Sequence, residues 1–201
     1  MKQSNSRCAV ILTALVLTAG LLIGLLTGCS QSQTGNSQPQ TGTPLQPTDP
    51  SIFRTSGSGI IIGYNCASHE LPKNLVIPNK IGDEVIIGIG IAAFRGCRSL
   101  KTLDLSACTN LKSIGRAAFE DCGFTSVIFP ASLTRIHIFA FCDCHSLNSV
   151  IFADTKGWAA YDDEECTQNK TPIASSDLET VGTAAQYLYN NYFNKYWKKT
   201  N

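Results

Sequence analysis

The feature that most constrains this chain is a nine-residue pattern that occurs three times along its centre. The pattern begins with isoleucine, carries phenylalanine at its sixth position and ends with cysteine, and it occupies residues 89–97, 114–122 and 136–144. The phenylalanines Phe94, Phe119 and Phe141 are separated by 25 and then by 22 residues. A period of about 20 to 29 residues with recurring leucine-type positions is typical of a leucine-rich repeat solenoid.

The second half of each unit contains the short strand that such a repeat needs. Leu100, Leu103, Leu105 and Cys108 follow the spacing of the general strand segment of leucine-rich repeats. Other apolar residues take these positions elsewhere: Phe124, Val127 and Phe129, then Leu147, Val150 and Phe152, with Leu75 and Ile77 in an earlier, irregular turn. Because so short a strand cannot bury its apolar side alone, the turns must stack. We therefore predict a leucine-rich repeat solenoid, rich in β-strand, with short helical or 3-10 turns.

Stacking places each side chain above its counterpart in the next turn, so that every repeat position becomes a column of the core. We expect three such columns: Phe94, Phe119 and Phe141; Ile89, Ile114 and Ile136; and Cys97, Cys122 and Cys144. A cysteine in such a column most simply acts as a small buried apolar side chain.

The amino-acid sequence of the repeats also resembles that of a known family. The units IGRAAFEDCGFTSVIFPASLTRI and FCDCHSLNSVIF are similar to the BspA-like leucine-rich repeats of bacterial surface proteins. The flanks GYNCASHELPKNLVIPNKIGDEVIIGIG and FADTKGWAAY resemble treponemal members of that family, so that the resemblance covers residues 57–199. The chain departs from the family pattern at Gly123, which shortens one unit, and at Ile138 and Phe139, which replace the usual polar pair.

The N-terminal residues have the layout of a secretory signal. Lys2 and Arg7 precede an almost wholly apolar stretch over residues 9–26, and Leu26-Thr27-Gly28-Cys29 resembles the lipobox of bacterial lipoproteins. That resemblance makes residues 1–28 a signal peptide and Cys29 the site of lipid attachment. Two or three acyl chains give a stable membrane anchor. The alternative is an uncleaved membrane helix, since residues 9–27 just reach the length that spans a bilayer.

The next segment differs sharply in composition. Residues 30–50 contain one clearly apolar side chain, Leu45, and one charge, Asp49, so they bury too little surface to offset the entropy of ordering. We interpret residues 29–56 as a lipidated flexible linker. The repeat domain is then expected over residues 57–155 and a C-terminal cap over residues 156–201.

Seven cysteines lie between Cys66 and Cys166. Cys142, Cys144, His137 and His145 could be drawn as metal ligands, but their spacing fits no established four-ligand zinc pattern. We expect no metal and no cofactor. Exported proteins can form disulfides, and Cys66 and Cys166, which stand outside the columns, are the better candidates. Whether these two cysteines meet is left open by the sequence.

The composition argues against two broad functions. The formal net charge of +1 gives no overall attraction to nucleic acid. Three histidines offer little general acid–base chemistry, and the sequence contains no nucleophile elbow or phosphate-binding loop. The acidic run at residues 162–165 is most simply a solvated loop, because it lacks the spacing and the glycine of a calcium-binding loop. We therefore expect that the protein is not an enzyme.

The last turn of a solenoid needs a cover. Tyr189, Tyr192, Phe193, Tyr196 and Trp197 recur at steps of three and four residues, which predicts a partly helical cap over residues 177–199. Ser176 and Asp177 are candidates to cap the start of its helix, and Lys198 and Lys199 suit the helix C-terminus. An aromatic stripe of this kind is usually core, and stacking on a cofactor is the weaker interpretation.

The strand pattern also predicts a binding surface. If Leu103 and Leu105 point inward, alternation places the residue between them outside, as part of an exposed row: Val76, Asp104, Ile128 and Ile151. A polar row flanks it: Asn74, Thr102, Ser126 and Ser149. Exposed apolar residues with a polar border mark interaction sites. The alternative explanation is strand propensity, because β-branched side chains fit the pleated surface of a sheet.

The resemblance implies a lipid-anchored protein exported to the cell envelope, at the outer membrane or the cell surface. Its repeats would bind a protein or matrix partner in an adhesin-like role, towards host matrix, host cells or other bacteria. The alternative is a periplasm-facing scaffold or envelope-assembly lipoprotein without an external ligand. An enzyme of unrecognised type ranks third.

Overall fold

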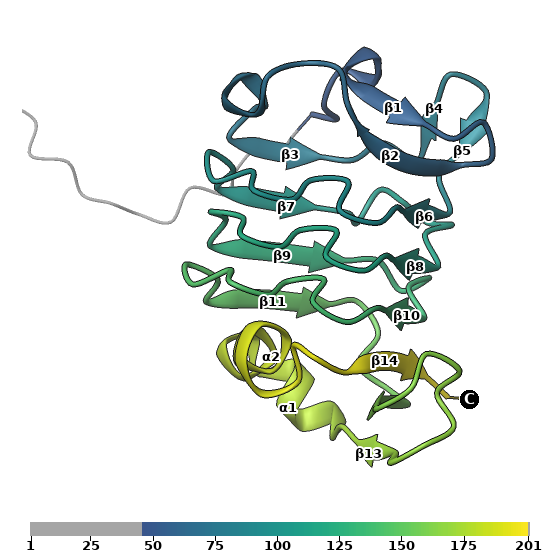
Figure 1. Ribbon diagram of the computed structural model, residues 1–201, viewed down its shortest axis with the longest axis vertical. Helices are drawn as coiled ribbons and strands as arrows, with labels where there is room; N and C mark the ends of the chain where they lie inside the picture. Colours follow the sequence, from purple (N-terminus) through teal and green to yellow (C-terminus); the bar gives the residue numbers. More distant parts are fainter. Residues whose placement is uncertain (1–45, 201) are drawn as a thin grey trace, which may run out of the picture. The chain divides into compact units, whose positions relative to one another are not determined.

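The computed structural model describes residues 46–200. The predicted signal peptide, the lipid attachment site Cys29 and most of the predicted linker lie outside the described residues. These residues form a stack of turns in which each repeat supplies one strand to each of two parallel stacks of strands (Figure 1). The predicted leucine-rich repeat solenoid is thereby confirmed.

The longer strands of the repeats form a four-stranded parallel sheet. It contains β3 (Asn74–Val76), β7 (Thr102–Asp104), β9 (Ser126–Phe129) and β11 (Ser149–Phe152). Each strand pairs with the next in constant register, so that Leu75, Leu103, Val127 and Val150 lie side by side. Their side chains point inward and are at most 1% exposed. Side chains along these strands therefore alternate between the inner and the outer face of the sheet, as the sequence predicts.

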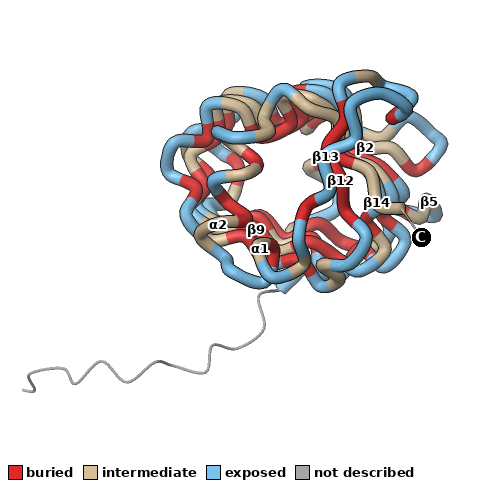
Figure 2. Tube along the Cα trace, turned by 90° about the horizontal axis from the view of Figure 1, so that it is seen from below, coloured by how far each residue is buried: buried red, intermediate tan, exposed pale blue. Residues whose placement is uncertain are grey.

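A second set of strands from the same turns, each two residues long except for β2, forms the core of an eight-stranded sheet. Its parallel part contains β2 (Ile60–Tyr64), β6 (Gly88–Ile89), β8 (Ser113–Ile114) and β10 (Arg135–Ile136). The isoleucines Ile61, Ile89, Ile114 and Ile136 face inward and are at most 2% exposed. Figure 2, which looks along the stack, shows buried residues mostly on the inner side of the turns and exposed residues on the outer side.

The N-terminal end of the stack is closed by elements that include residues predicted to belong to the linker. A 3-10 turn, η1 (Pro50–Ile52), leads into β1 (Phe53–Thr55), which pairs antiparallel with β2. The predicted linker over residues 29–56 therefore extends too far, because Phe53 is buried against Phe94 with ring centroids 6.3 Å apart. The same end carries η2 (Ser68–Glu70) and the hairpin of β4 (Lys80–Ile81) and β5 (Glu84–Val85).

One aromatic column runs through the core. Tyr64, Phe94, Phe119 and Phe141 stack with centroid separations of 5.7, 5.3 and 5.4 Å, and each of the three phenylalanines is at most 1% exposed. Offset stacking at this distance adds favourable interaction energy to the burial of apolar area.

The cysteine column contributes hydrogen bonds as well as volume. The Sγ of Cys122 donates to the carbonyl oxygen of Phe94 in the preceding turn at 3.0 Å, and Cys144 donates to Phe119 in the same way at 3.0 Å. Cys108, on the other side of the turn, donates to Ile77 at 3.1 Å. Carbonyl groups inside a solenoid have no access to water, so a weak thiol donor satisfies part of their requirement.

The turns that follow the short strands have an unusual backbone. Ala92, Ala117 and Phe139 occupy the same repeat position, and all three have a positive φ of 51°, 55° and 60°. Four residues later Gly96, Asp121 and Asp143 repeat this conformation. Glycine and aspartate tolerate it, whereas alanine and especially phenylalanine pay about 1 kcal/mol or more. The repeated turn therefore holds its strain because the stacked turns on either side fix the backbone.

The C-terminal cap is partly helical, as predicted, but its last part is a strand. The cap contains β12 (Trp158–Tyr161), β13 (Thr171–Pro172), α1 (Ser175–Glu179), α2 (Val181–Gln186), a π-helical turn η3 (Tyr187–Asn191) and β14 (Tyr196–Lys199). β14 pairs antiparallel with β10 on one side and with β12 on the other. The helix end expected at Lys198 and Lys199 is a strand instead, because the open edge of β10 offers backbone partners that override the helical spacing of the aromatic residues.

Two smaller expectations fail with it. α1 begins after Ala174, with no hydrogen bond from a capping side chain, so that neither Ser176 nor Asp177 caps it. Lys198 and Lys199 lie in β14 and are not at a helix end. Trp197, the centre of this strand, is 1% exposed and stacks on Phe152 with a centroid separation of 6.4 Å, so it covers the core of the last turn.

Candidate functional site

The predicted binding surface is the outer face of the four-stranded sheet. Pairing aligns Asn74, Thr102, Ser126 and Ser149 in one row and Val76, Asp104, Ile128 and Ile151 in the next. Within the polar row, Thr102 Oγ1 donates to Asn74 Oδ1 at 2.9 Å. In the second row Ile151 is 46% exposed, whereas Asp104 and Ile128 are half-buried. We name these two rows, without Val76, the strand face.

Val76 does not belong to this surface. Its side chain is 4% exposed, although the row was expected to be open along its whole length. The chain segment before η1 covers it, since Thr48 N donates to the carbonyl oxygen of Val76 at 3.0 Å and Thr48 Oγ1 accepts from Val76 N at 3.0 Å. The first strand of the sheet is thus shielded by residues that the sequence placed in the linker.

Within residues 46–200, no cysteine is hydrogen-bonded to a histidine. Cys97 is fully buried, and although hydrogen bonding from Cys122 and Tyr64 lowers the pKa of its thiol to about 7, no substrate can reach it. Burial raises the pKa of Cys108 and of Cys144 to about 12, so that both remain protonated. Cys66 and Cys166, which we considered as a disulfide pair, are both free thiols.

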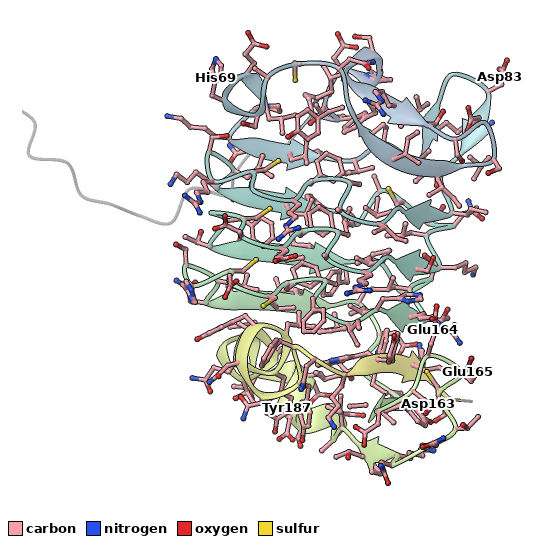
Figure 3. All side chains as sticks on the ribbon, viewed as in Figure 1. His69, Asp83, Asp163, Glu164, Glu165 and Tyr187 are labelled. Atoms are coloured by element: carbon pink, nitrogen blue, oxygen red, sulfur yellow. The ribbon has the colours of Figure 1, made fainter. Side chains whose placement is uncertain are left out.

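The three histidines lie in different parts of the described structure, and His69 is labelled in Figure 3. His69 is on η2, His145 Nε2 lies 3.8 Å from Asp143, and His137 Nδ1 lies 3.8 Å from Glu164 Oε1. Burial, followed by the charge of Arg135, lowers the pKa of His137, and Glu164 offsets part of this shift.

Two carboxylates of the acidic loop at residues 162–165 are bound to other residues of the chain. Asp163 accepts hydrogen bonds from the backbone N–H groups of Thr167 and Gln168, and Asp162 pairs with Lys195. The hydroxyl of Thr167, which donates to Asp163 at 2.7 Å, and then these backbone bonds lower the pKa of Asp163, and the bond with Lys195 lowers the pKa of Asp162. Across residues 46–200, no group of three or more His, Cys, Asp or Glu side chains is arranged to hold a metal ion.

The structure adds two adjoining grooves that we did not predict. The first has a volume of about 530 Å³, a floor of Ala92 and Ala117, and walls that include Ile91, Arg116 and Phe139. The second, of about 320 Å³, shares Ile91 and Arg116 with the first and extends to Tyr196 and Glu164. Its floor is glycine, because a Cβ on Gly115 would lie 2.8 Å from the carbonyl carbon of Gly90 in the turn above.

One signal in the sequence could have located these grooves. Phe139 stands where the two preceding turns carry alanine, Ala92 and Ala117, and it forms a wall of the first groove. The lining as a whole could not have been found in this way, because it comes from three turns and from the cap strand β14.

The sequence of the repeats matches one family model. The model, described as a BspA type leucine rich repeat region, matches residues 61–194 in six copies. The chain belongs to this family of BspA-type leucine-rich repeat proteins. The match covers every strand of both parallel stacks except the start of β2, in agreement with the resemblance seen in the sequence.

Solved structures of bacterial leucine-rich repeat proteins are similar to parts of this BspA-type chain. A T. pallidum leucine-rich repeat protein is 28% identical over 53% of this chain and 50% of its own, with a TM-score of 0.45. A Bacteroides ovatus leucine-rich repeat protein is 23% identical over 48% of this chain and 37% of its own (TM-score 0.22). A leucine rich cell surface protein from Faecalibacterium prausnitzii is 14% identical over 62% of this chain and 60% of its own (TM-score 0.25).

The BspA-type chain thus spans about half the length of the T. pallidum protein. No curated protein matches its sequence significantly. Among residues 46–200, no helix has both the length and the apolar character to cross a bilayer.

Proposed function

We propose that the protein is a lipid-anchored, exported binding protein without catalytic activity, and that its strand face binds a macromolecular partner in an adhesin-like role. The observation that carries this proposal is the constant register of the four parallel strands, which lines up side chains of one kind over several turns. Repeat solenoids use such extended surfaces for protein binding. The anchor rests on the lipobox-like sequence that ends at Cys29.

The strand face has the composition of a small interaction surface. Its apolar part, Ile128 and Ile151, lies beside a row of hydroxyl and amide side chains that can hydrogen-bond to a partner. Exposed apolar groups with a polar border are typical of protein-binding patches. Host matrix, host cells and other bacteria are the partner classes that the family resemblance suggests.

A double substitution tests the location of the site. Ile128→Glu with Ile151→Glu places two like charges on neighbouring strands of the strand face, where a partner would have to desolvate them. We expect binding to immobilised fibronectin, used as a matrix probe, to weaken at least tenfold, while the thermal midpoint changes by no more than a few degrees, since neither side chain is fully buried. Binding can be followed by surface plasmon resonance and folding by circular dichroism.

Lys112→Glu with Thr134→Glu serves as a control, because both residues are exposed and lie outside the strand face. If the doubly substituted strand face binds as well as the parent chain, the partner contacts another surface. If the parent chain shows no saturable binding to matrix proteins or to bacterial cells, the periplasm-facing scaffold is the better explanation.

A further inference from the structure

A column of three positions lies beside the two grooves: Ile91 and Arg116 are exposed and line both grooves, and Ile138 is half-buried. Ile91, Arg116 and Ile138 occupy the third position of the repeated turn in three consecutive repeats, immediately before the residue of positive φ. Backbone bonds stack them, since Ala92 N donates to Arg116 O at 3.0 Å and Ala117 N donates to Ile138 O at 3.2 Å. We call these three residues the ridge. It lies on the turns that follow the eight-stranded sheet, away from the strand face.

The charge on the ridge has no counterpart in the described part of the chain. The neighbouring arginines on these turns are paired between repeats: Arg95 with Glu120 at 2.9 Å and Arg98 with Asp121 at 2.6 Å. Arg116 is exposed, and within residues 46–200 no carboxylate oxygen lies within 4.0 Å of its side-chain nitrogens. Its neighbours in the column are two isoleucines. The grooves contain two carboxylates, but Glu120 is paired with Arg95 and Glu164 lies 3.8 Å from His137.

The apolar groups beside this arginine are held in place. Ile91 is 74% exposed, the highest value among the large apolar side chains of residues 46–200. The ring of Phe139 lies 5.9 Å from the guanidinium carbon of Arg116 and 6.0 Å from the Phe193 ring, and Phe139 N donates to Phe193 O at 2.6 Å. A guanidinium positioned over an aromatic ring keeps its planar donor edge available for a carboxylate.

We propose that the ridge and its grooves bind an extended peptide segment of a partner protein that carries an acidic side chain between two apolar ones. The carboxylate would pair with Arg116, and the apolar side chains would enter the two grooves against Ile91 and Phe139. Adjacent turns are about 4.8 Å apart, so the distance along the ridge from Ile91 to Ile138, about 10 Å, matches about three residues of an extended chain. This inference concerns a surface other than the strand face and does not depend on the proposed adhesin role.

The geometry favours a peptide over an acidic carbohydrate. Both grooves have linings that mix apolar and charged side chains, with Phe139 as an apolar contact in the first and Ile60 in the second. The combination of an unpaired cation with two separated apolar contacts matches a peptide with alternating side chains. In the second groove the acidic Glu164 is directed towards His137, with 3.8 Å between Oε1 and Nδ1 (Glu164 is labelled in Figure 3). The cationic end of the surface is therefore at Arg116.

The test begins with a random peptide library displayed on phage and selected on the immobilised full-length chain. We expect enrichment of peptides with Asp or Glu flanked by apolar residues two or three positions apart. Two variants then locate the site. Arg116→Gln removes the charge, and Ala92→Asn fills the floor of the first groove with a residue that tolerates the positive φ of this position.

The selected peptide should bind each of these variants about tenfold more weakly in fluorescence polarisation. Lys101→Gln and Ala107→Asn are the matched controls, since both residues are exposed and line neither groove, and they should leave the affinity unchanged. Replacing the acidic residue of the peptide by its amide should cost the same tenfold. Combining that change with Arg116→Gln should cost no more than either change alone, because both remove one interaction.

Three outcomes would overturn the proposal: selected peptides without an acidic residue, unchanged affinity for Arg116→Gln and Ala92→Asn, or binding that depends on Arg116 only for acidic glycans on an array. The strand-face variant Ile128→Glu with Ile151→Glu should still bind the peptide, so that failure of one site is distinguishable from failure of the other.

Discussion

Individual residues in this protein are stabilised mainly by their counterparts in the turns above and below. Phe119 illustrates this, because its ring stacks on Phe94 on one side and on Phe141 on the other and also meets Phe124 at 6.0 Å. Cys122 and Cys144 connect the same turns through thiol–carbonyl hydrogen bonds. A substitution at the middle turn therefore disturbs three repeats at once.

Phe119→Ala should lower the free energy of unfolding by about 3 to 5 kcal/mol, because it opens a cavity in the middle of the aromatic column. This is a large part of the about 5 to 15 kcal/mol that stabilises an ordinary domain. Cys122→Ser should cost less, since a hydroxyl can still donate to the carbonyl of Phe94 although its shorter bond lengthens the contact. Urea unfolding monitored by tryptophan fluorescence measures both losses. Parent-like midpoints for both variants would show that the columns do not carry the stability of the stack.

At the scale of elements, the strands of the repeats were predictable and the covering elements were not. Leu103 and Leu105 show the period of two within a strand. Leu103 and Val127 show the period of more than twenty residues between repeats, and both periods are visible in the sequence. β14 could not be predicted, because Tyr196 and Trp197 also fit a helical stripe and only the exposed edge of β10 decides between the two. Val76 was misplaced for a similar reason, since its cover comes from Thr48, nearly thirty residues away, which no local pattern connects to it.

The seam between β10 and the cap should make stability depend on pH. His137, directly after β10, packs against Tyr196 of β14 with ring centroids 5.8 Å apart, and burial lowers its pKa below the ordinary value of 6.5. The unfolded chain therefore binds a proton on this side chain at a higher pH than the folded chain does. Stability is full above about pH 6.5, falls as the pH decreases through that value and levels off below the lowered pKa.

His137→Gln should remove this part of the acid sensitivity. The difference in unfolding free energy between the variant and the parent, measured by urea titration from pH 8 to pH 5, should change in favour of the variant as the pH falls. His145→Gln, at a side chain that is 81% exposed, is the control for the loss of one imidazole. A constant difference between His137→Gln and the parent over this range would contradict the expected coupling.

At the scale of the whole molecule, the proposed role depends on where the chain is held. Cys29 follows the apolar segment at residues 9–26 and precedes a stretch that is poor in apolar residues, so that lipid at this position would leave the repeats outside the membrane. Different elements close the two ends of the eight-stranded sheet: β1 at one end, and β14, β12 and β13 at the other.

Cys29→Ala should abolish labelling by a radioactive or clickable fatty acid and should move the protein from the membrane fraction to the soluble fraction of the envelope, because no acyl chain remains to hold it. Cys8→Ala is the matched control and should leave both labelling and fractionation unchanged. Retention in the membrane with an uncleaved N-terminus would instead support a membrane helix over residues 9–27. Protease treatment of intact cells, which digests only surface-exposed protein, would separate an adhesin from a periplasm-facing scaffold.

The constant register of the parallel strands has a consequence for how such a protein can change in size. β8 presents to β10 the same kind of edge that β6 presents to β8, and only the outermost strands contact the closing elements. Duplication of one internal repeat in the gene would therefore insert a turn without requiring any change in β1 or β14. Each added turn would lengthen both sheets by about 4.8 Å. Reach along the axis could thus evolve independently of the residues that terminate the stack.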